Sequence, residues 1–306
     1  MASSLIWKVR RNIQWIKLIA RRNDIMLYYP ELKAEDNRVN IHIHDVIRTG
    51  YDYYDNGKYP YNLGDCLALP IINFMLSKKG VKADKAVKGK KHLFTVGSGG
   101  LRSFQDTTIW GTGIMYDGLK GKWFEKYWDA NHRHLDIRAV RGPLTREVFL
   151  KLGHKCPEVY GDPGILMPLV YQPNDIKKTR SYGVIPQYTV EKEVRKYFSD
   201  DVVISMNSND YKSVIDKIVS CEIVYSSSLH GIILAEAYGV PAVFFRGVHP
   251  LIDFKYKDYY ASTGRPNVIL AANFVEALKM DPPCLPELSK LQQGLMDAFP
   301  YDLWES

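Results

Sequence analysis

A serine-rich turn that ends in a histidine is the segment of this chain best suited to chemistry. Ser226-Ser-Ser-Leu-His230 lies between two apolar runs, and the residues after it favour a helix. A neutral imidazole can take up or release a proton, and the unpaired amides at the start of a helix attract phosphate or carboxylate. The pattern predicts proton transfer beside a bound anion. On residue types alone a second interpretation stays open, in which His230 is solvated or caps the helix and the serines only form a turn.

The residues around His230 predict the elements that would hold it. Ser227 or Ser228 can cap a helix over 229–238, and Gly239 followed by Val-Pro can end it. The flanking β-branched and aromatic runs are typical of strands buried on both faces, namely residues 222–225 and 242–245. A parallel-sheet unit of this kind places its chemistry at the turn after a strand.

A second basic candidate follows another predicted strand. Ile137-Arg-Ala-Val-Arg141 precedes Gly142-Pro143, where proline fits the first helical turn, and Gly153 ends that helix. At the strand end, the planar guanidinium of Arg141 would suit an anionic group. An ordinary surface arginine is the alternative on residue types alone.

Glycine-containing turns occur earlier in the chain. Asn62-Leu-Gly-Asp65 precedes an apolar helical run, and Asp65 either caps that helix or reaches a sugar hydroxyl. Gly97-Ser98-Gly99-Gly100 follows a strand-like run and allows close approach of the backbone to a ligand, or else a tight connection. It lacks the third glycine and the following acid of a dinucleotide fingerprint, which argues against a nicotinamide cofactor.

These motifs together resemble the polysaccharide pyruvyl transferase family. The resemblance rests on Asn-Leu-Gly-Asp65, the two glycine turns ending at Gly100 and Ile114, Val-Arg141, Asp162-Pro163 and Ser-Ser-Ser-Leu-His230-Gly, and it spans about residues 60–264. The segment 254–264 looks like one in succinoglycan-type members. Two departures occur: Gly142 stands where the family often has aspartate, and Ser228 stands where many members have arginine.

The resemblance implies transfer of the pyruvate moiety of phosphoenolpyruvate to a sugar of a surface polysaccharide or its lipid-linked precursor, forming a cyclic ketal and releasing phosphate. His230 would be the general acid. The expected donor-binding residues are Arg141, Lys255, Arg246, Ser227 and Ser228. The expected acceptor-binding residues are Asn62, Asp65, Gly97, Ser98 and Gly99. Phosphoenolpyruvate would be a co-substrate, with no metal and no other cofactor.

Two other functions stay open at this point. The same architecture hosts glycosyltransferases that use nucleotide sugars, because a fold alone does not decide the chemistry. The chain could also be a non-catalytic protein that binds sugar for assembly. A nucleotide should protect a glycosyltransferase against heat, whereas phosphoenolpyruvate should protect a ketal transferase.

The length of 306 residues and the alternating strand and helix patterns predict an α/β protein with two doubly wound, Rossmann-like domains that face each other across a cleft, as in GT-B enzymes. The expected units are a basic amphipathic helix at 1–22, an acceptor-side domain at 23–170 and a donor-side domain with a helical tail at 180–306. A polar, proline-punctuated stretch at 168–179 separates the two domains.

The four cysteines show no metal-binding spacing, and the start of the chain lacks the pattern of an export signal, so we expect a cytoplasmic protein with free thiols. Residues 5–22 place apolar side chains on one helical face and basic ones on the other. That pattern favours either binding to the inner face of the plasma membrane or docking on the first domain. The net charge of +7 is concentrated in this segment and at 78–91. Because few aromatic residues lie among the basic residues at 78–91, we do not expect nucleic-acid binding.

Overall fold

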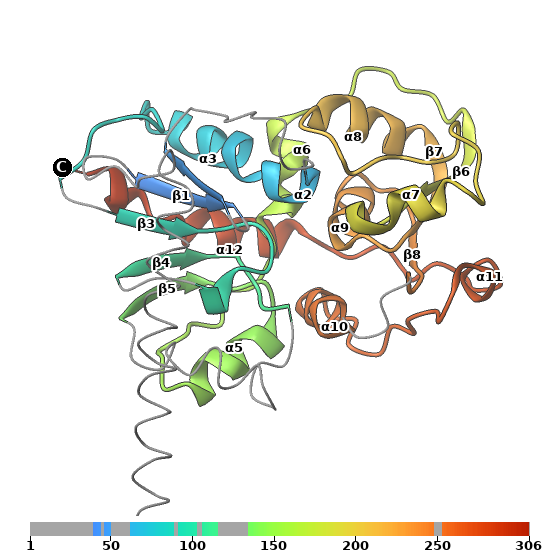
Figure 1. Cartoon of the computed structure of the whole chain (residues 1–306). Helices are drawn as coiled ribbons and strands as arrows, with labels where there is room; N and C mark the ends of the chain where they lie inside the picture. Colours follow the sequence, from blue (N-terminus) through green and yellow to red (C-terminus); the bar gives the residue numbers. More distant parts are fainter. Residues whose placement is uncertain are drawn as a thin grey trace, which may run out of the picture.

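The computed structural model describes residues 39–43, 46–49, 62–88, 91–102, 106–115, 134–247 and 253–305. Two separate β-sheets dominate this part of the chain, one built from its first half and one from its second (Figure 1). Helices lie between the strands in sequence and against the sheets in space. The predicted α/β class is therefore confirmed, and the amino-terminal helix predicted at 1–22 lies outside the described residues.

The first sheet has five strands in the order β2-β1-β3-β4-β5. Their bounds are β1 Val39–Ile43, β2 Val46–Thr49, β3 Lys91–Phe94, β4 Thr107–Trp110 and β5 Leu135–Ala139. β1, β3, β4 and β5 run parallel, whereas β1 and β2 form an antiparallel pair. The first sheet is therefore mixed rather than wholly parallel.

Both faces of the first sheet are buried, because neighbouring residues of its central strands enter different cores. Leu93 and Trp110 pack in the core with α2 (Leu63–Cys66) and α3 (Ala68–Ser77). Phe94 and Ile109 pack instead with α5 (Pro143–Lys151). Leu93 and Phe94, like Ile109 and Trp110, are therefore buried at successive positions.

The second sheet contains β6 Arg180–Ile185, β7 Cys221–Ser226 and β8 Ala242–Phe244, all parallel and in sequence order. One face packs with α8 (Tyr211–Val219) and α9 (Leu229–Ala237). The other packs with the short helices α7 (Glu191–Val194) and α11 (Phe274–Ala277). Single bridges at Val203 and Ala271 extend the sheet at both edges.

In the connection between the sheets, the last stretch before β6, residues 171–179, contains no helix or strand. The 3₁₀ turn η4 (Pro163–Leu166) and α6 (Met167–Val170) end before β6 begins at Arg180. One hydrophobic cluster contains residues of both sheets, including Trp110 and Ile185. The break predicted at 168–179 lies in this connection, while the domain limits themselves stay predictions.

The carboxyl-terminal tail returns to the first sheet. α12 (Ser289–Asp297) lies against β4, where the Trp110 indole donates to the Leu295 carbonyl over 2.9 Å and meets the Phe299 ring edge-on. Lys85 and Lys91 donate to backbone carbonyls of the final turn η6 (Tyr301–Trp304). Part of the basic segment 78–91 therefore holds the tail in place.

Within the described ranges, none of the helices is long and apolar enough to cross a bilayer. Helix α10 (Asp253–Ser262) lies beside α5 and below the second sheet in Figure 1. It thus links the later part of the chain to the first sheet.

Candidate active site

His230 lies in the first turn of α9, as the sequence predicts. β7 ends at Ser226, and Ser228 occupies the N-cap, where its hydroxyl accepts from the Gly231 amide over 3.4 Å. Gly239 ends the helix with a φ of +72°, a left-handed conformation that glycine adopts without strain. The side chain of His230 is buried, with 7% of the residue exposed. A solvated histidine is therefore excluded.

The imidazole of His230 contacts the first half of the chain. A Cβ placed on Gly64 would lie 1.8 Å from His230 Nδ1, so only glycine permits this approach at the start of α2. On the other side, Nε2 lies 3.6 Å from Oδ2 of Asp162. Asp162 is fully buried at the N-cap of η4, and its Oδ1 accepts from the Gly164 amide over 2.9 Å.

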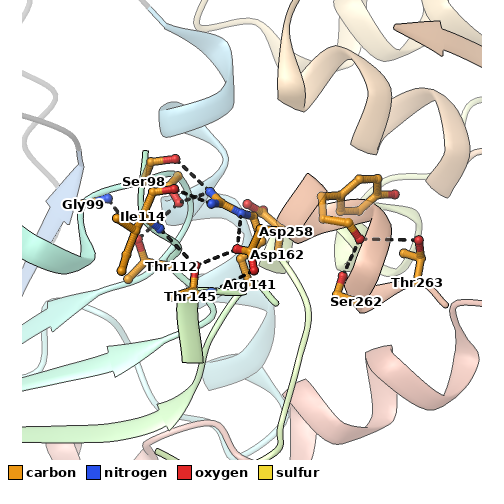
Figure 2. A network of polar contacts seen from close by, with 12 residues as sticks. Ser98, Gly99, Thr112, Ile114, Arg141, Thr145, Asp162, Asp258, Ser262 and Thr263 are labelled. Atoms are coloured by element: carbon orange, nitrogen blue, oxygen red, sulfur yellow. Dashed lines mark hydrogen bonds and ion pairs between the residues drawn. The ribbon is translucent and has the colours of Figure 1, made fainter. Parts of the chain in front are cut away.

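Arg141 follows β5 and is fully buried, which excludes the alternative that it is an ordinary surface arginine. Figure 2 shows its guanidinium inside a network of polar contacts. Nε donates to Asp258 over 3.0 Å, NH1 donates to Ser98 Oγ over 2.8 Å and to the Gly97 carbonyl, and NH2 donates to the Ile114 carbonyl over 2.6 Å. Arg141 thus ties α10 to the glycine turns instead of projecting freely from the sheet.

Asp258 completes this network from α10. Its carboxylate accepts from the Thr145 hydroxyl over 2.6 Å and from the Thr145 amide over 2.9 Å, besides Arg141. A Cβ on Gly142 would lie 2.2 Å from the Asp258 carbonyl oxygen. Glycine at 142 is therefore required by the close approach of α10 to the start of α5.

Lys255 lies in α10 and is a buried cation. The residue is 8% exposed, and Nζ lies 5.0 Å from the centre of the Tyr256 ring. Among the residues that the structure describes, Nζ has no hydrogen-bond acceptor and no ion-pair partner. Burial lowers its pKa to about 8, with a further lowering by the Arg141 charge and an opposing effect of Asp65.

The expected acceptor-side residues lie around the same charges. Asn62 occupies the N-cap of α2 and donates to Asp65 Oδ2 over 2.6 Å. Asp65 is the N-cap residue of neither α2, where it lies within the helix, nor α3, whose N-cap is Leu67, so the expectation that it caps the apolar helix is wrong. A Cβ on Gly97 would lie 2.9 Å from Asp65 Oδ1, and Gly97 has a φ of +98°. Gly99 donates through its amide to the Thr112 hydroxyl over 3.2 Å, which joins the two glycine turns.

The other donor-side candidates serve partly as supports. The Ser227 hydroxyl accepts from the Gln187 amide over 3.0 Å, and its carbonyl accepts from the Tyr256 hydroxyl over 2.7 Å. Arg246 pairs with Asp253 over 2.6 Å, at the start of α10. The Arg246 Nε is buried and, within the described ranges, has no hydrogen-bond partner.

Together these contacts assemble one site from both halves of the chain. A buried imidazole, a buried carboxylate and two buried cations come from α9, η4, the end of β5 and α10. Groups of these kinds are the ones that bind an anion and move a proton. Sequence reasoning missed Asp162 and Asp258 as site residues, although Asp162-Pro163 was among the motifs that it compared.

Comparisons with known proteins agree with the motifs. The profile of the polysaccharide pyruvyl transferase family matches residues 37–247. An uncharacterized protein of Acanthamoeba polyphaga mimivirus is 30% identical over 184 residues, which cover 56% of this chain and 60% of that protein. The succinoglycan biosynthesis protein ExoV of Rhizobium meliloti is 28% identical over 175 residues, covering 55% of this chain and 52% of ExoV.

The chain thus spans between half and two thirds of the length of these two relatives. A solved structure of an uncharacterized protein from Klebsiella pneumoniae has a TM-score of 0.44 and 11% identity, covering 82% of this chain and 98% of that one.

Proposed function

The chain belongs to the polysaccharide pyruvyl transferase family, and from that premise we propose that it transfers the pyruvate moiety of phosphoenolpyruvate to a sugar of a surface polysaccharide or its lipid-linked precursor. The product is a cyclic pyruvate ketal, and inorganic phosphate is released. One relative, ExoV, is described as a succinoglycan biosynthesis protein, which supports a polysaccharide as the acceptor class.

The unpaired ammonium of Lys255 is the observation that carries the proposal. In the described part of the chain the ammonium contacts the Tyr256 ring but no carboxylate or other hydrogen-bond acceptor, and burial lowers the pKa of Lys255 to about 8. An anion at Nζ would offset the cost of that burial. Phosphoenolpyruvate carries a phosphate and a carboxylate, and one of these groups binds Lys255, while Arg141, paired with Asp258, supports the site through its contacts with the first glycine turn.

Proton transfer falls to His230 in this mechanism. The imidazolium donates a proton to the methylene carbon of the enol, which makes the second carbon electrophilic. A sugar hydroxyl bonds to that carbon and loses its proton, the carbon–oxygen bond to phosphate breaks, and a second hydroxyl closes the ketal. The two hydroxyl protons balance the proton that the methylene gained and the one that the departing phosphate takes.

The remaining candidates take supporting roles. The Ser228-capped start of α9 supplies amides for an anionic oxygen of the donor, and Ser227 and Arg246 line the same side of the site. The acceptor side of the site is lined by Asn62, Asp65 and the 97–99 turn. We propose that the two sheet units face each other as in GT-B enzymes, with the donor held between them. This chemistry requires phosphoenolpyruvate as co-substrate and no metal or redox cofactor.

Melting experiments test the donor directly. A ligand at 100 times its Kd stabilises a protein by about 2.7 kcal/mol, so phosphoenolpyruvate should raise the Tm of the wild type. Lys255→Met should remove this shift, whereas Lys257→Met, an exposed neighbour on α10, should keep it. Protection by uridine diphosphate instead would favour a nucleotide-sugar glycosyltransferase and overturn the proposal.

Residues 5–22 enter the proposal through their sequence alone. Their apolar and basic faces suit an anionic membrane surface, where lipid-linked acceptors lie, so we propose a cytoplasmic enzyme held at the inner face of the plasma membrane. Flotation with vesicles containing phosphatidylglycerol tests it. Binding should fall when residues 1–22 are deleted, and unchanged binding would remove the membrane role but not the enzymatic one.

A further inference from the structure

The two ring nitrogens of His230 have different surroundings. Nε2 lies 3.6 Å from Oδ2 of Asp162, and in the described part of the chain neither atom has a hydrogen-bond partner, although both are fully buried. Nδ1 lies over Gly64, at the start of α2. Nε2 is fully buried, whereas Nδ1 is not among the fully buried unpaired atoms of the described part of the chain, so Nδ1 is the ring nitrogen left for a substrate.

The position of the proton on the neutral ring follows from this contact. If Nε2 carried no hydrogen, its lone pair would face a carboxylate oxygen, and two buried acceptors would oppose each other without a donor. With a hydrogen on Nε2, the imidazole donates toward Oδ2. The separation exceeds a normal N–H···O distance of about 2.9 Å, but catalytic hydrogen bonds are often long before the substrate binds.

Asp162 is itself rigidly placed. It is fully buried, its Oδ1 is occupied by the Gly164 amide at 2.9 Å, and Pro163 follows it directly. These contacts aim the second oxygen, Oδ2, at the imidazole. Gly64 supports the ring from its other side, since any Cβ there would occupy the place of Nδ1. The Asp162 carboxylate and Gly64 thus fix both the orientation and the position of the His230 imidazole.

We propose that Asp162 is a positioning residue that accepts the Nε2 hydrogen of His230 and leaves Nδ1 as the atom that exchanges protons with the substrate. The inference rests on the proposed function only for the identity of that substrate. The tautomer itself is a property of the protein without ligand. It assigns a role to the aspartate of the Asp162-Pro163 pair, which the expected site residues did not include.

Nuclear magnetic resonance on the full chain labelled with ¹⁵N-histidine measures the tautomer. The His230 signal is identified by its loss in His230→Gln. In the neutral ring of the wild type, Nε2 should carry the hydrogen and Nδ1 should not. In Asp162→Asn, the amide NH₂ can donate to Nε2, so the hydrogen should move to Nδ1. A wild type with the hydrogen on Nδ1, or the same tautomer in both proteins, would overturn the proposal.

Kinetics give an independent readout. Asparagine caps helices as well as aspartate does, so Asp162→Asn should melt close to the wild type. A positioned acid or base accelerates a reaction by roughly 10²- to 10⁴-fold. Because Asp162→Asn should lose part of this acceleration, its kcat should fall at least about tenfold. The KM for phosphoenolpyruvate should change less than about threefold. An unchanged kcat would contradict the role of Asp162.

The two proposals fail in different ways. If the wild type shows the expected tautomer and its change in Asp162→Asn, but releases no phosphate from phosphoenolpyruvate, the assignment of Asp162 stands and the proposed function fails. If phosphate is released and the tautomer is the opposite one, the function stands and the assignment fails.

Discussion

Replacing Lys255 by methionine should stabilise the protein without ligand while destroying its ability to bind the donor. Lys255 is buried, and burial lowers its pKa from 10.5 to about 8. Each unit corresponds to about 1.4 kcal/mol, so the buried ammonium costs the folded state about 3 kcal/mol. Methionine fills a similar volume without the charge. The free energy of unfolding at pH 7 should therefore rise by up to about 3 kcal/mol.

The pH dependence gives this prediction a sign that can be checked. Between about pH 8 and 10.5 the unfolded lysine still binds a proton that the folded lysine has released, so the stability of the wild type rises with pH across this window. Below pH 8 both states hold the proton and the full cost remains. The advantage of Lys255→Met should thus be largest at pH 7 and should vanish toward pH 10.5.

Urea unfolding at pH 7, 8, 9 and 10 measures the difference between the two proteins, which cancels the other groups that titrate in this range. Lys257→Met, an exposed position on the same helix, is the matched control and should give a difference that is small and independent of pH. A Lys255→Met protein that is less stable than the wild type at pH 7 would show that the ammonium is already paired, and would refute the reasoning.

Two further substitutions test the packing of the site. Gly64→Ala should displace the His230 ring, because the new Cβ would lie 1.8 Å from Nδ1, and the rate of phosphate release should fall at least about tenfold. Gly294→Ala is the control and should leave that rate unchanged, because its Cβ would make only an ordinary contact at 3.7 Å. Asp258→Asn should lower the free energy of unfolding in urea by about 3 to 5 kcal/mol, since it leaves the Arg141 charge buried without its carboxylate; a loss below about 1 kcal/mol would contradict the structural role of this pair.

Local signals made the strand, turn and helix around His230 predictable. The expected strands at 222–225 and 242–245 agree with β7 and β8 to within a residue at each end. Ser228 and Gly239 bound α9 because capping and left-handed turns depend on a few neighbouring residues. The placement of His230 in the first helical turn followed from these boundaries.

Contacts between distant residues could not be predicted in the same way. Arg141 was expected at a strand end, and it lies there, but its burial depends on Asp258, which is 117 residues away in the chain. The approach of Asp162 to His230 likewise depends on how the two sheets pack. Nor did residue spacing show that the carboxyl-terminal tail returns to β4, since a helical apolar pattern indicates a buried face without naming its partner.

Release of inorganic phosphate from phosphoenolpyruvate in the presence of a polysaccharide or a lipid-linked sugar tests the central claim most directly. The wild type should release phosphate and add one pyruvate ketal per acceptor, as seen by mass spectrometry. His230→Ala, shown by a cooperative melting transition to be folded, should lose at least about 10²-fold in kcat. A folded His230→Ala protein that turns over at the wild-type rate would contradict the account.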